Sequence, residues 1–203
     1  MRTIDLNADL GEGGSQDAAL IALASSANIA CGGHAGNDDT MRAAIDGCIS
    51  AGVAIGAHPG YEDRENFGRR PMDLEPAAVA ELVSRQIGRF AKLAARAGAE
   101  IHHVKPHGAL YHQADHDPAL AAAVAESVMC LLPGCGFYVP PAGALAVAGE
   151  AAGLDVWAEG FVDRRYQENG ALVPRGEPGA VIGSPKTPLH RLCKSPASSG
   201  RKP

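Results

Sequence analysis

Residues able to transfer protons or hold charge gather in short segments spread along the chain. The segment Lys105-Pro106-His107-Gly108 places a cation and a titratable imidazole within one turn. A fixed cation can offset negative charge that develops during a reaction, and an imidazole can take up or deliver a proton near neutral pH. We therefore treat this segment as the first candidate for catalysis.

Two further histidines lie in glycine-rich turns, where a backbone can come close to a ligand. His34 ends Cys31-Gly32-Gly33-His34, and His58 lies in Ala57-His58-Pro59-Gly60. Both could be satisfied structural groups, or they could bind a metal ion together with a carboxylate such as Asp9. Cys31 is expected to pack in the core, because nothing near it in the sequence would activate its thiol.

Other charged residues have a structural and a functional explanation, and the sequence leaves both open. Asp9 and Glu12 could cap a helix, since acidic groups favour helix starts, or they could face a substrate. Arg69 and Arg70 could be solvated, or they could bind a carboxylate through paired N–H groups.

A dense group of charges also follows Trp157 near the end of the apolar part of the chain. Glu159, Asp163 and Arg164 could pair with one another or belong to a site. Tyr111 and Tyr166 are expected to be pocket walls.

The elements that must position these residues alternate between short apolar runs and segments of helical period. This alternation predicts an α/β fold with βα units around a parallel sheet. Strands are predicted over residues 3–8, 27–30, 53–57, 101–105, 136–139 and 155–158. Helices are predicted to begin near residues 38, 76, 117 and 141, where capping residues or prolines precede apolar stripes.

The candidate residues follow the predicted strands at their carboxyl ends. In parallel α/β folds these ends share one face, so we expect the candidates to surround one mouth. They are Asn7, Asp9, Glu12, Asn28, His34, His58, Arg69, Arg70, Lys105, His107, Tyr111, Glu159, Asp163 and Arg164.

Composition narrows the classes of partner. The chain has 203 residues and a formal net charge of −5, so it lacks the basic field that binds nucleic acid. It contains no apolar run of about 18 residues, and acidic residues occupy the place of a signal peptide, so we expect no membrane segment and a cytoplasmic location. Its five cysteines without CxxC spacing fit a reducing compartment.

Several motifs in fixed order resemble the signatures of the LamB/YcsF family. They are residues 5–12 (DLNADLGE), 27–36 (ANIACGGHAG), 57–60 (AHPG), 67–70 (FGRR), 104–111 (VKPHGALY) and 159–164 (EGFVDR). The likeness spans residues 1–183. The remaining stretch, 184–203, is basic, rich in proline and free of acidic residues, so we expect a non-family, disordered ending and a barrel that is C-terminally incomplete.

The resemblance implies a distorted parallel (β/α) barrel of the glycoside hydrolase/deacetylase type, formed by residues 1–183 as one domain. It also implies one component of a multi-component amidohydrolase that opens 5-oxo-L-proline to L-glutamate with ATP and Mg2+, together with two partner subunits of B and C type. No G-x-x-x-x-G-K-[ST] segment occurs, so a Walker phosphate cradle is absent from the sequence.

Roles for the candidates follow from the chemistry that this reaction would need. Asp9 or Glu159 could activate water, Lys105 could offset charge on the lactam oxygen, and His107 could shuttle the proton. Arg69 or Arg70 could bind the substrate carboxylate. The further substrate-binding candidates are Asn7, Glu12, Asn28, Asp163 and Arg164.

Two alternatives remain open at this stage. One is a stand-alone metal-dependent hydrolase or deacetylase, in which Asp9, His34, His58 and His107 bind a divalent transition metal ion that activates water. The other is a non-catalytic binding subunit or a degenerate fragment that presents substrate to its partners.

Overall fold

The computed structural model describes residues 4–168 and 170–182. These residues fall into two compact units, whose boundary lies between Glu159 and Gly160. The predicted non-family ending, 184–203, lies outside the described residues. Within them, no helix is long and apolar enough to span a bilayer.

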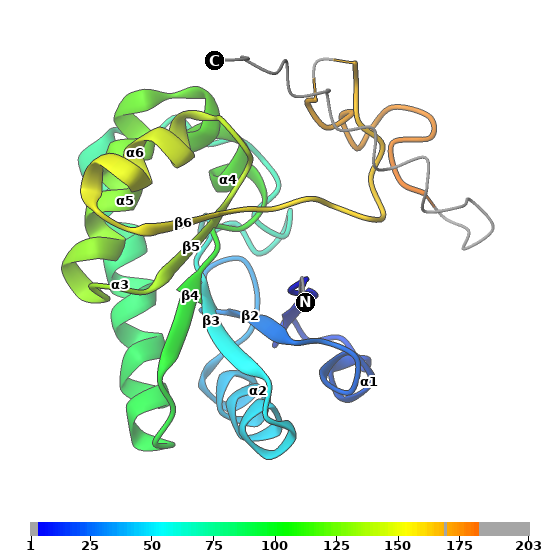
Figure 1. Cartoon of the computed structure of the whole chain (residues 1–203), viewed down its shortest axis with the longest axis vertical. Helices are drawn as coiled ribbons and strands as arrows, with labels where there is room; N and C mark the ends of the chain where they lie inside the picture. The colour runs from blue at the N-terminus through cyan, green and yellow to red at the C-terminus, as the bar shows by residue number, and fades with distance from the viewer. Residues whose placement is uncertain (1–3, 169, 183–203) are drawn as a thin grey trace, which may run out of the picture. The chain divides into compact units, whose positions relative to one another are not determined.

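The first unit alternates strands with helices, as the apolar pattern predicts (Figure 1). Its elements are β1 (Asn7–Leu10), α1 (Asp17–Ile21), β2 (Ser26–Ala30), α2 (Asp38–Ala51), β3 (Ala54–His58), α3 (Pro76–Arg96), β4 (Ile101–Val104), α4 (Gly108–His116), α5 (Pro118–Leu131), β5 (Gly136–Val139), α6 (Ala144–Ala152) and β6 (Asp155–Ala158).

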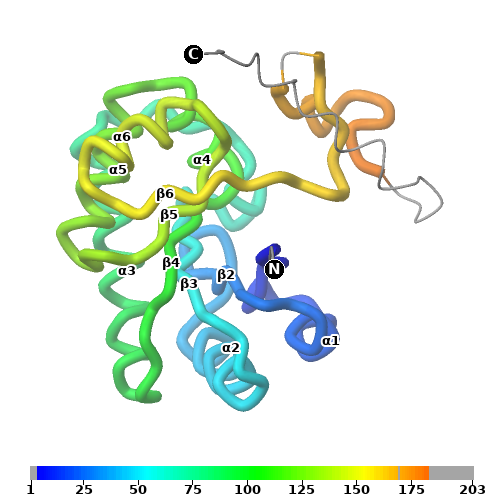
Figure 2. Tube along the Cα trace, in the orientation of Figure 1, coloured from blue at the N-terminus to red at the C-terminus, as the bar shows by residue number. Residues whose placement is uncertain are grey.

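All six strands are parallel and pair in chain order from β1 to β6, so each strand lies beside its predecessor (Figure 2). The helices α1, α2, α3, α5 and α6 pack on one another in sequence along this sheet. The predicted α/β fold with a parallel sheet is therefore confirmed. Within the described residues β6 does not pair with β1, and the completeness of the barrel stays a prediction.

Local sequence signals set the helix ends. Asn37 caps α2 by accepting hydrogen bonds from the backbone of Asp39 and Thr40, and Gly52 ends it with a φ of 70°. Pro76 occupies the first turn of α3, where its missing N–H costs nothing. Asp117 caps α5 directly before Pro118.

The two faces of the sheet differ in polarity. The face toward the helices is apolar and fully packed, with Ala27, Ile29, Ile55, Ala57, Val104, Phe137 and Val139 in the hydrophobic core. The alternate residues form the inner face and are joined by hydrogen bonds, ion pairs or ring contacts: Asp5, Asn7, Asp9, Ser26, Asn28, His58, His103, Lys105, Tyr138, Trp157 and Glu159.

This alternation corrects two predictions. The first strand runs from Asn7 to Leu10 rather than over residues 3–8. Asn7, Asp9, Asn28 and His58 therefore lie within strands rather than after them. The prediction places polar side chains after the end of a strand. In the structure they alternate with apolar residues within the strand and lie on its inner face.

The second unit begins at Gly160. Two antiparallel bridges shape it, Arg164 with Val181 and Tyr166 with Leu172. The side chain of Arg164 is buried and donates hydrogen bonds to the carbonyls of Ala180 and Val173, at 3.4 and 2.7 Å. Arg164 thus stabilises this unit internally.

Candidate active site

The centre of the site is Lys105, the first residue after β4. Its Nζ lies 2.7 Å from Oε1 of Glu159, 3.2 Å from Oδ1 of Asp9 and 3.2 Å from Oδ1 of Asn7. Burial opposes the charge on Lys105, but Asp9 and Glu159 outweigh burial and raise the pKa of the ammonium. Lys105 therefore stays a cation that links β1, β4 and the end of β6.

Asp9 is held in its ionised form. Its Oδ1 accepts a hydrogen bond from Nδ2 of Asn28 at 2.9 Å, and its Oδ2 lies 3.5 Å from Nε2 of His58. Burial opposes ionisation, yet His58 and Lys105 together hold the pKa of Asp9 well below its usual value. A carboxylate stabilised in this way is a weak base.

Glu159 completes the ion-paired group from the opposite side of Lys105. Its side chain is only 6% exposed, and its Oε2 accepts a hydrogen bond of 3.2 Å from the hydroxyl of Tyr111 on α4. Tyr111 therefore lies beside the ion-paired group. Tyr166 belongs to the second unit, where its hydroxyl accepts from the backbone N–H of Phe161 at 2.6 Å.

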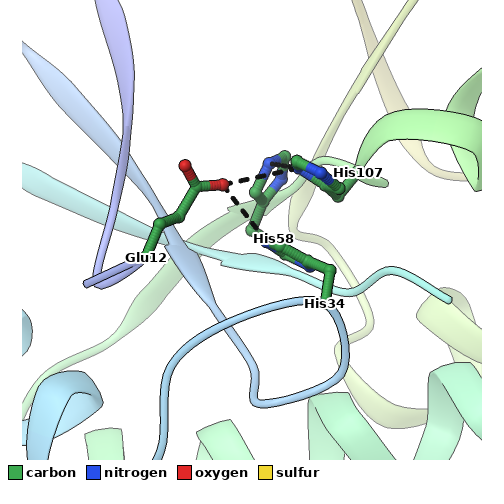
Figure 3. Close-up of side chains that lie close together, drawn as sticks. All are labelled: Glu12, His34, His58 and His107. Carbon is green, nitrogen blue, oxygen red and sulfur yellow. Dashed lines mark hydrogen bonds and ion pairs between the residues drawn. The ribbon is translucent and has the colours of Figure 1, made fainter. Parts of the chain in front are cut away.

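Next to this group, the imidazoles of His34, His58 and His107 lie together on one side of the carboxylate of Glu12 (Figure 3). Nε2 of His34 lies 3.1 Å from Oε1 of Glu12, and Nδ1 of His107 lies 3.5 Å from the same oxygen. His34 stacks on His107 with ring centres 3.6 Å apart. One nitrogen or oxygen from each of these residues and from His58 lies within 4.8 Å of all the others.

Backbone carbonyls determine which nitrogens of His58 and His107 carry protons. Nδ1 of His58 lies 2.6 Å from the carbonyl of Lys105, and Nε2 of His107 lies 2.9 Å from that of Phe67. A carbonyl only accepts, so both nitrogens donate. The remaining nitrogens, Nε2 of His58 and Nδ1 of His107, face each other at 2.9 Å. If both rings are neutral, two lone pairs meet there, and a proton or a cation between them would relieve the repulsion.

Burial keeps two of these rings neutral. It is the main cause that lowers the pKa of His107 to about 2 and that of His34 to about 3, with repulsion from His58 adding to it. Burial also raises the pKa of Glu12. A neutral His107 has no proton to deliver at Nδ1, and its lowered pKa makes that nitrogen a weak base, so this geometry does not favour the predicted shuttle role.

The sequence profile of the LamB/YcsF family matches residues 4–198. The chain belongs to the LamB/YcsF family. A relative from Methylococcus capsulatus, named as the A subunit of 5-oxoprolinase, is 50% identical over 189 residues, which are 91% of this chain and 73% of the relative.

A solved structure supports the same assignment. The crystal structure of the lactam utilization protein from Thermus thermophilus has a TM-score of 0.86 and 41% identity, covering 91% of this chain and 76% of that one. The resemblance inferred from the motifs is thus confirmed. The family match continues past residue 183 to residue 198, and the nature of the ending stays a prediction.

In this LamB/YcsF protein the loop after β3 holds the histidines in place. Phe67 has a φ of 56°, which is strained for a residue with a side chain, and its carbonyl accepts the hydrogen bond from His107. Gly68 follows with a φ of 61°, and a Cβ there would come within 2.6 Å of the Cβ of His34. The FGRR motif therefore has a structural reason for its glycine.

The two arginines of that motif differ in their surroundings. The guanidinium of Arg69 lies 4.9 Å from the centre of the Phe67 ring, and its charge acts to lower the pKa of Glu12. Arg70 is exposed. The structure thus connects Arg69 to the histidine cluster. Asp163 and Arg164 belong to the second unit.

Sequence reasoning passed over two residues that contact the site. His103 is fully buried on the inner face and hydrogen-bonds to Asn28, and Phe67 orients His107 through its carbonyl. The polar alternation of His103 and Lys105 around Val104 could have revealed the first. Nothing local in the sequence shows the left-handed backbone of Phe67.

Proposed function

We propose that this LamB/YcsF protein is the A component of a multi-component amidohydrolase that opens 5-oxo-L-proline to L-glutamate with ATP hydrolysis. The observation that carries the proposal is the 50% identity, over most of both chains, to a protein named as the A subunit of 5-oxoprolinase. The structural relative is called a lactam utilization protein, and 5-oxoproline is a lactam.

The site contains the groups that such a reaction needs. A lactam carbonyl is a poor electrophile, and conversion of its oxygen into a phosphate ester would create a group that water can displace. Lys105 is a buried cation suited to offset charge on that oxygen. Among the carboxylates, Glu12 has a raised pKa and is better suited than Asp9 to accept a proton from water. Arg69, whose charge acts to lower the pKa of Glu12, is our candidate for binding the substrate carboxylate.

We propose that ATP and Mg2+ are used by the complete enzyme and not by this chain alone. The sequence holds no Walker segment, so we assign the nucleotide chemistry to the assembly with B-type and C-type partner subunits. The chain alone is then expected to show little or no turnover.

Reconstitution tests the proposal. The chain is co-expressed with B-type and C-type subunits, and glutamate formed from 5-oxoproline is measured with and without ATP. We expect turnover only from the complete complex and only with ATP. A complete complex that forms no glutamate, or that forms it equally well without ATP, would contradict the proposal.

The histidine cluster favours a second candidate function, a metal-dependent hydrolase. Glu12, His34, His58 and His107 supply three nitrogens and one oxygen, a donor set that suits zinc or a similar ion. Nε2 of His58 and Nδ1 of His107 face each other at 2.9 Å and could both bind a cation, and both rings donate their other N–H to a carbonyl, as metal-binding histidines do. When bound, such an ion would supply Lewis acidity and a more acidic water.

His34 fits this set less well. Its Nδ1 is buried and has no hydrogen-bond partner in the described part of the chain. Metal analysis of the purified protein, and a thermal melt with and without Zn2+, test the second candidate without any assay of activity. Stabilisation by Zn2+ that is lost in His58→Asn and kept in His116→Asn, an exposed histidine on α4, would support it. No metal and no stabilisation would exclude it.

A further inference from the structure

His103 is a buried histidine that no proposed step uses. It is linked through Asn28 to Asp9, one member of the ion-paired group around Lys105. His103, on β4, is fully buried, and its ring stacks on Tyr138 with centres 4.1 Å apart. Its Nε2 lies 2.7 Å from Oδ1 of Asn28 on β2. The hydroxyl of Tyr138 in turn donates to Oδ2 of Asp5 at 3.0 Å. Nδ1 of His103 lies 3.2 Å from Nδ1 of His102, so Asn28, Tyr138 and His102 together hold the ring in place.

Asp9 determines the direction of the hydrogen bonds in this network. Its ionised carboxylate only accepts, so the Asn28 atom 2.9 Å away must be the NH2 group. The same NH2 group donates to Oδ1 of Asn7 at 2.6 Å. The Asn28 oxygen then faces His103, and Nε2 of His103 must carry a proton. Asp9 thus fixes the orientation of the Asn28 amide, and the N–H of His103 supports that orientation from the other end of the amide.

The neighbouring strand leaves room for this ring. A Cβ on Gly56 of β3 would lie 2.2 Å from Nε2 of His103, closer than any side chain tolerates. Any residue with a side chain at position 56 would displace the imidazole from Asn28. The register of β3 with β4 shifts at this point, between Ile55 and Gly56.

We propose that His103 is a positioning residue of the active site, which acts through Asn28 to hold Asp9 and Asn7 in place around Lys105. It touches none of the atoms expected to react. Misplacement of a catalytic group by about 1 Å can lower turnover by about 100-fold, so loss of this support should affect the rate more than substrate binding. The kinetic part of this inference rests on the proposed function.

Kinetics of the reconstituted complex give the first test. His103→Leu removes the donor, and we expect kcat to fall by about 10- to 100-fold while KM changes by less than about 2-fold. His103→Gln has an amide N–H near the position of Nε2 and should restore most of the loss. His116→Gln, at an exposed histidine on α4 away from this network, is the control and should leave kcat unchanged.

A second measurement does not depend on turnover. The side-chain NH2 signals of Asn28 in a 1H–15N spectrum, assigned by their loss in Asn28→Ser, should shift in His103→Leu and stay in place in His116→Gln. If His103→Leu is too unstable to study, His103→Asn serves instead, because its shorter amide cannot reach Asn28.

The two readouts separate the two proposals. Unchanged Asn28 signals would overturn the positioning role whatever the complex does. Shifted signals with an unchanged kcat in an active complex would overturn it as well. A wild-type complex without turnover would count against the proposed function, and the Asn28 signals would then decide on His103 alone.

Discussion

The outer and inner faces of the sheet are built from alternate residues of the same strands, yet the outer face is apolar and the inner face is polar. The outer residues, such as Ile29, Val104 and Phe137, are apolar and packed under the helices. The inner residues, such as Asn28 and Lys105, are buried and polar. Burial stabilises the outer face through the hydrophobic effect, whereas the inner face must satisfy each buried polar group with a partner. The helix-covered face therefore supplies the apolar packing that stabilises the fold, and the other face holds the candidate site residues.

Removal of the inner cation should produce the largest effect. Lys105→Met keeps the length of the side chain but leaves Asp9 and Glu159 without their shared partner. We expect turnover of the reconstituted complex to fall by about 10²- to 10⁴-fold, the range for a lost charge-stabilising or acid–base group. Lys92→Met, at an exposed lysine on α3, is the control and should keep full activity. Equal turnover of both variants would refute a catalytic role for the inner face.

Phe137 and Tyr138 are adjacent in β5 and lie on opposite faces of the sheet, Phe137 on the outer face and Tyr138 on the inner face. Phe137→Ala should cost about 3–5 kcal/mol of unfolding free energy, because the ring is fully buried in the core. Tyr138→Phe removes only the hydroxyl that donates to Asp5 and should cost about 1 kcal/mol. Denaturant unfolding measures both. A larger loss for Tyr138→Phe would mean that the inner face carries the stability.

Much of the fold could be predicted from the sequence, because the outer face follows simple rules. The β5 and β6 ranges are confirmed without change, and α3 begins at the predicted Pro76. The helix α4 had no prediction of its own, since its apolar stripe is short and no capping side chain marks its start. The first strand is predicted too early, over residues 3–8 instead of Asn7–Leu10, because the polar residues Asn7 and Asp9 resemble a loop that follows a strand.

The candidate site could be assembled from the sequence only as a set of strand ends. The strand-end pattern points to Asp9, Lys105, His107 and Glu159, and the structure brings these residues into one region. Their proton positions could not be predicted, because they depend on the carbonyls of Lys105 and Phe67, which approach only in three dimensions. The same holds for His103, whose importance depends on the space that Gly56 leaves.

Acid pH should destabilise the inner face before the outer one. Burial, and then His102, lower the pKa of His103 to about 3, against an ordinary value of 6.5. Asp5 opposes this shift, while Lys105 and His58 add to it. Between pH 6.5 and 3 the unfolded chain therefore binds a proton that the folded chain does not. Stability should fall as the pH is lowered through that window, by about 1.4 kcal/mol per pH unit at most for this one group.

His34 and His107 also have lowered pKa values and therefore also destabilise the protein at acid pH. A variant at position 103 and a control variant separate the contribution of His103 from theirs. In thermal melts between about pH 7 and about pH 4, a range that covers most of this window, His103→Gln should lose less stability than the wild type. His116→Gln, at an exposed histidine on α4, should retain the wild-type slope. Parallel slopes for all three proteins would show that His103 is not the neutral buried group described.

The smallest expected effect distinguishes the two arginines at the edge of the inner face. Lysine keeps the charge of arginine but loses the planar pair of N–H donors that binds a carboxylate. Both arginines are exposed, but the guanidinium of Arg69 lies over the Phe67 ring and its charge acts to lower the pKa of Glu12. Arg69→Lys should therefore raise the KM for 5-oxoproline by about 10-fold with little change in kcat, because the interaction is made equally in the ground state and the transition state. Arg70→Lys, one residue further along the same loop, should leave both constants unchanged. If the two variants raise KM alike, the arginines act only through their general positive charge, and the substrate carboxylate must be bound by another group of the assembled enzyme.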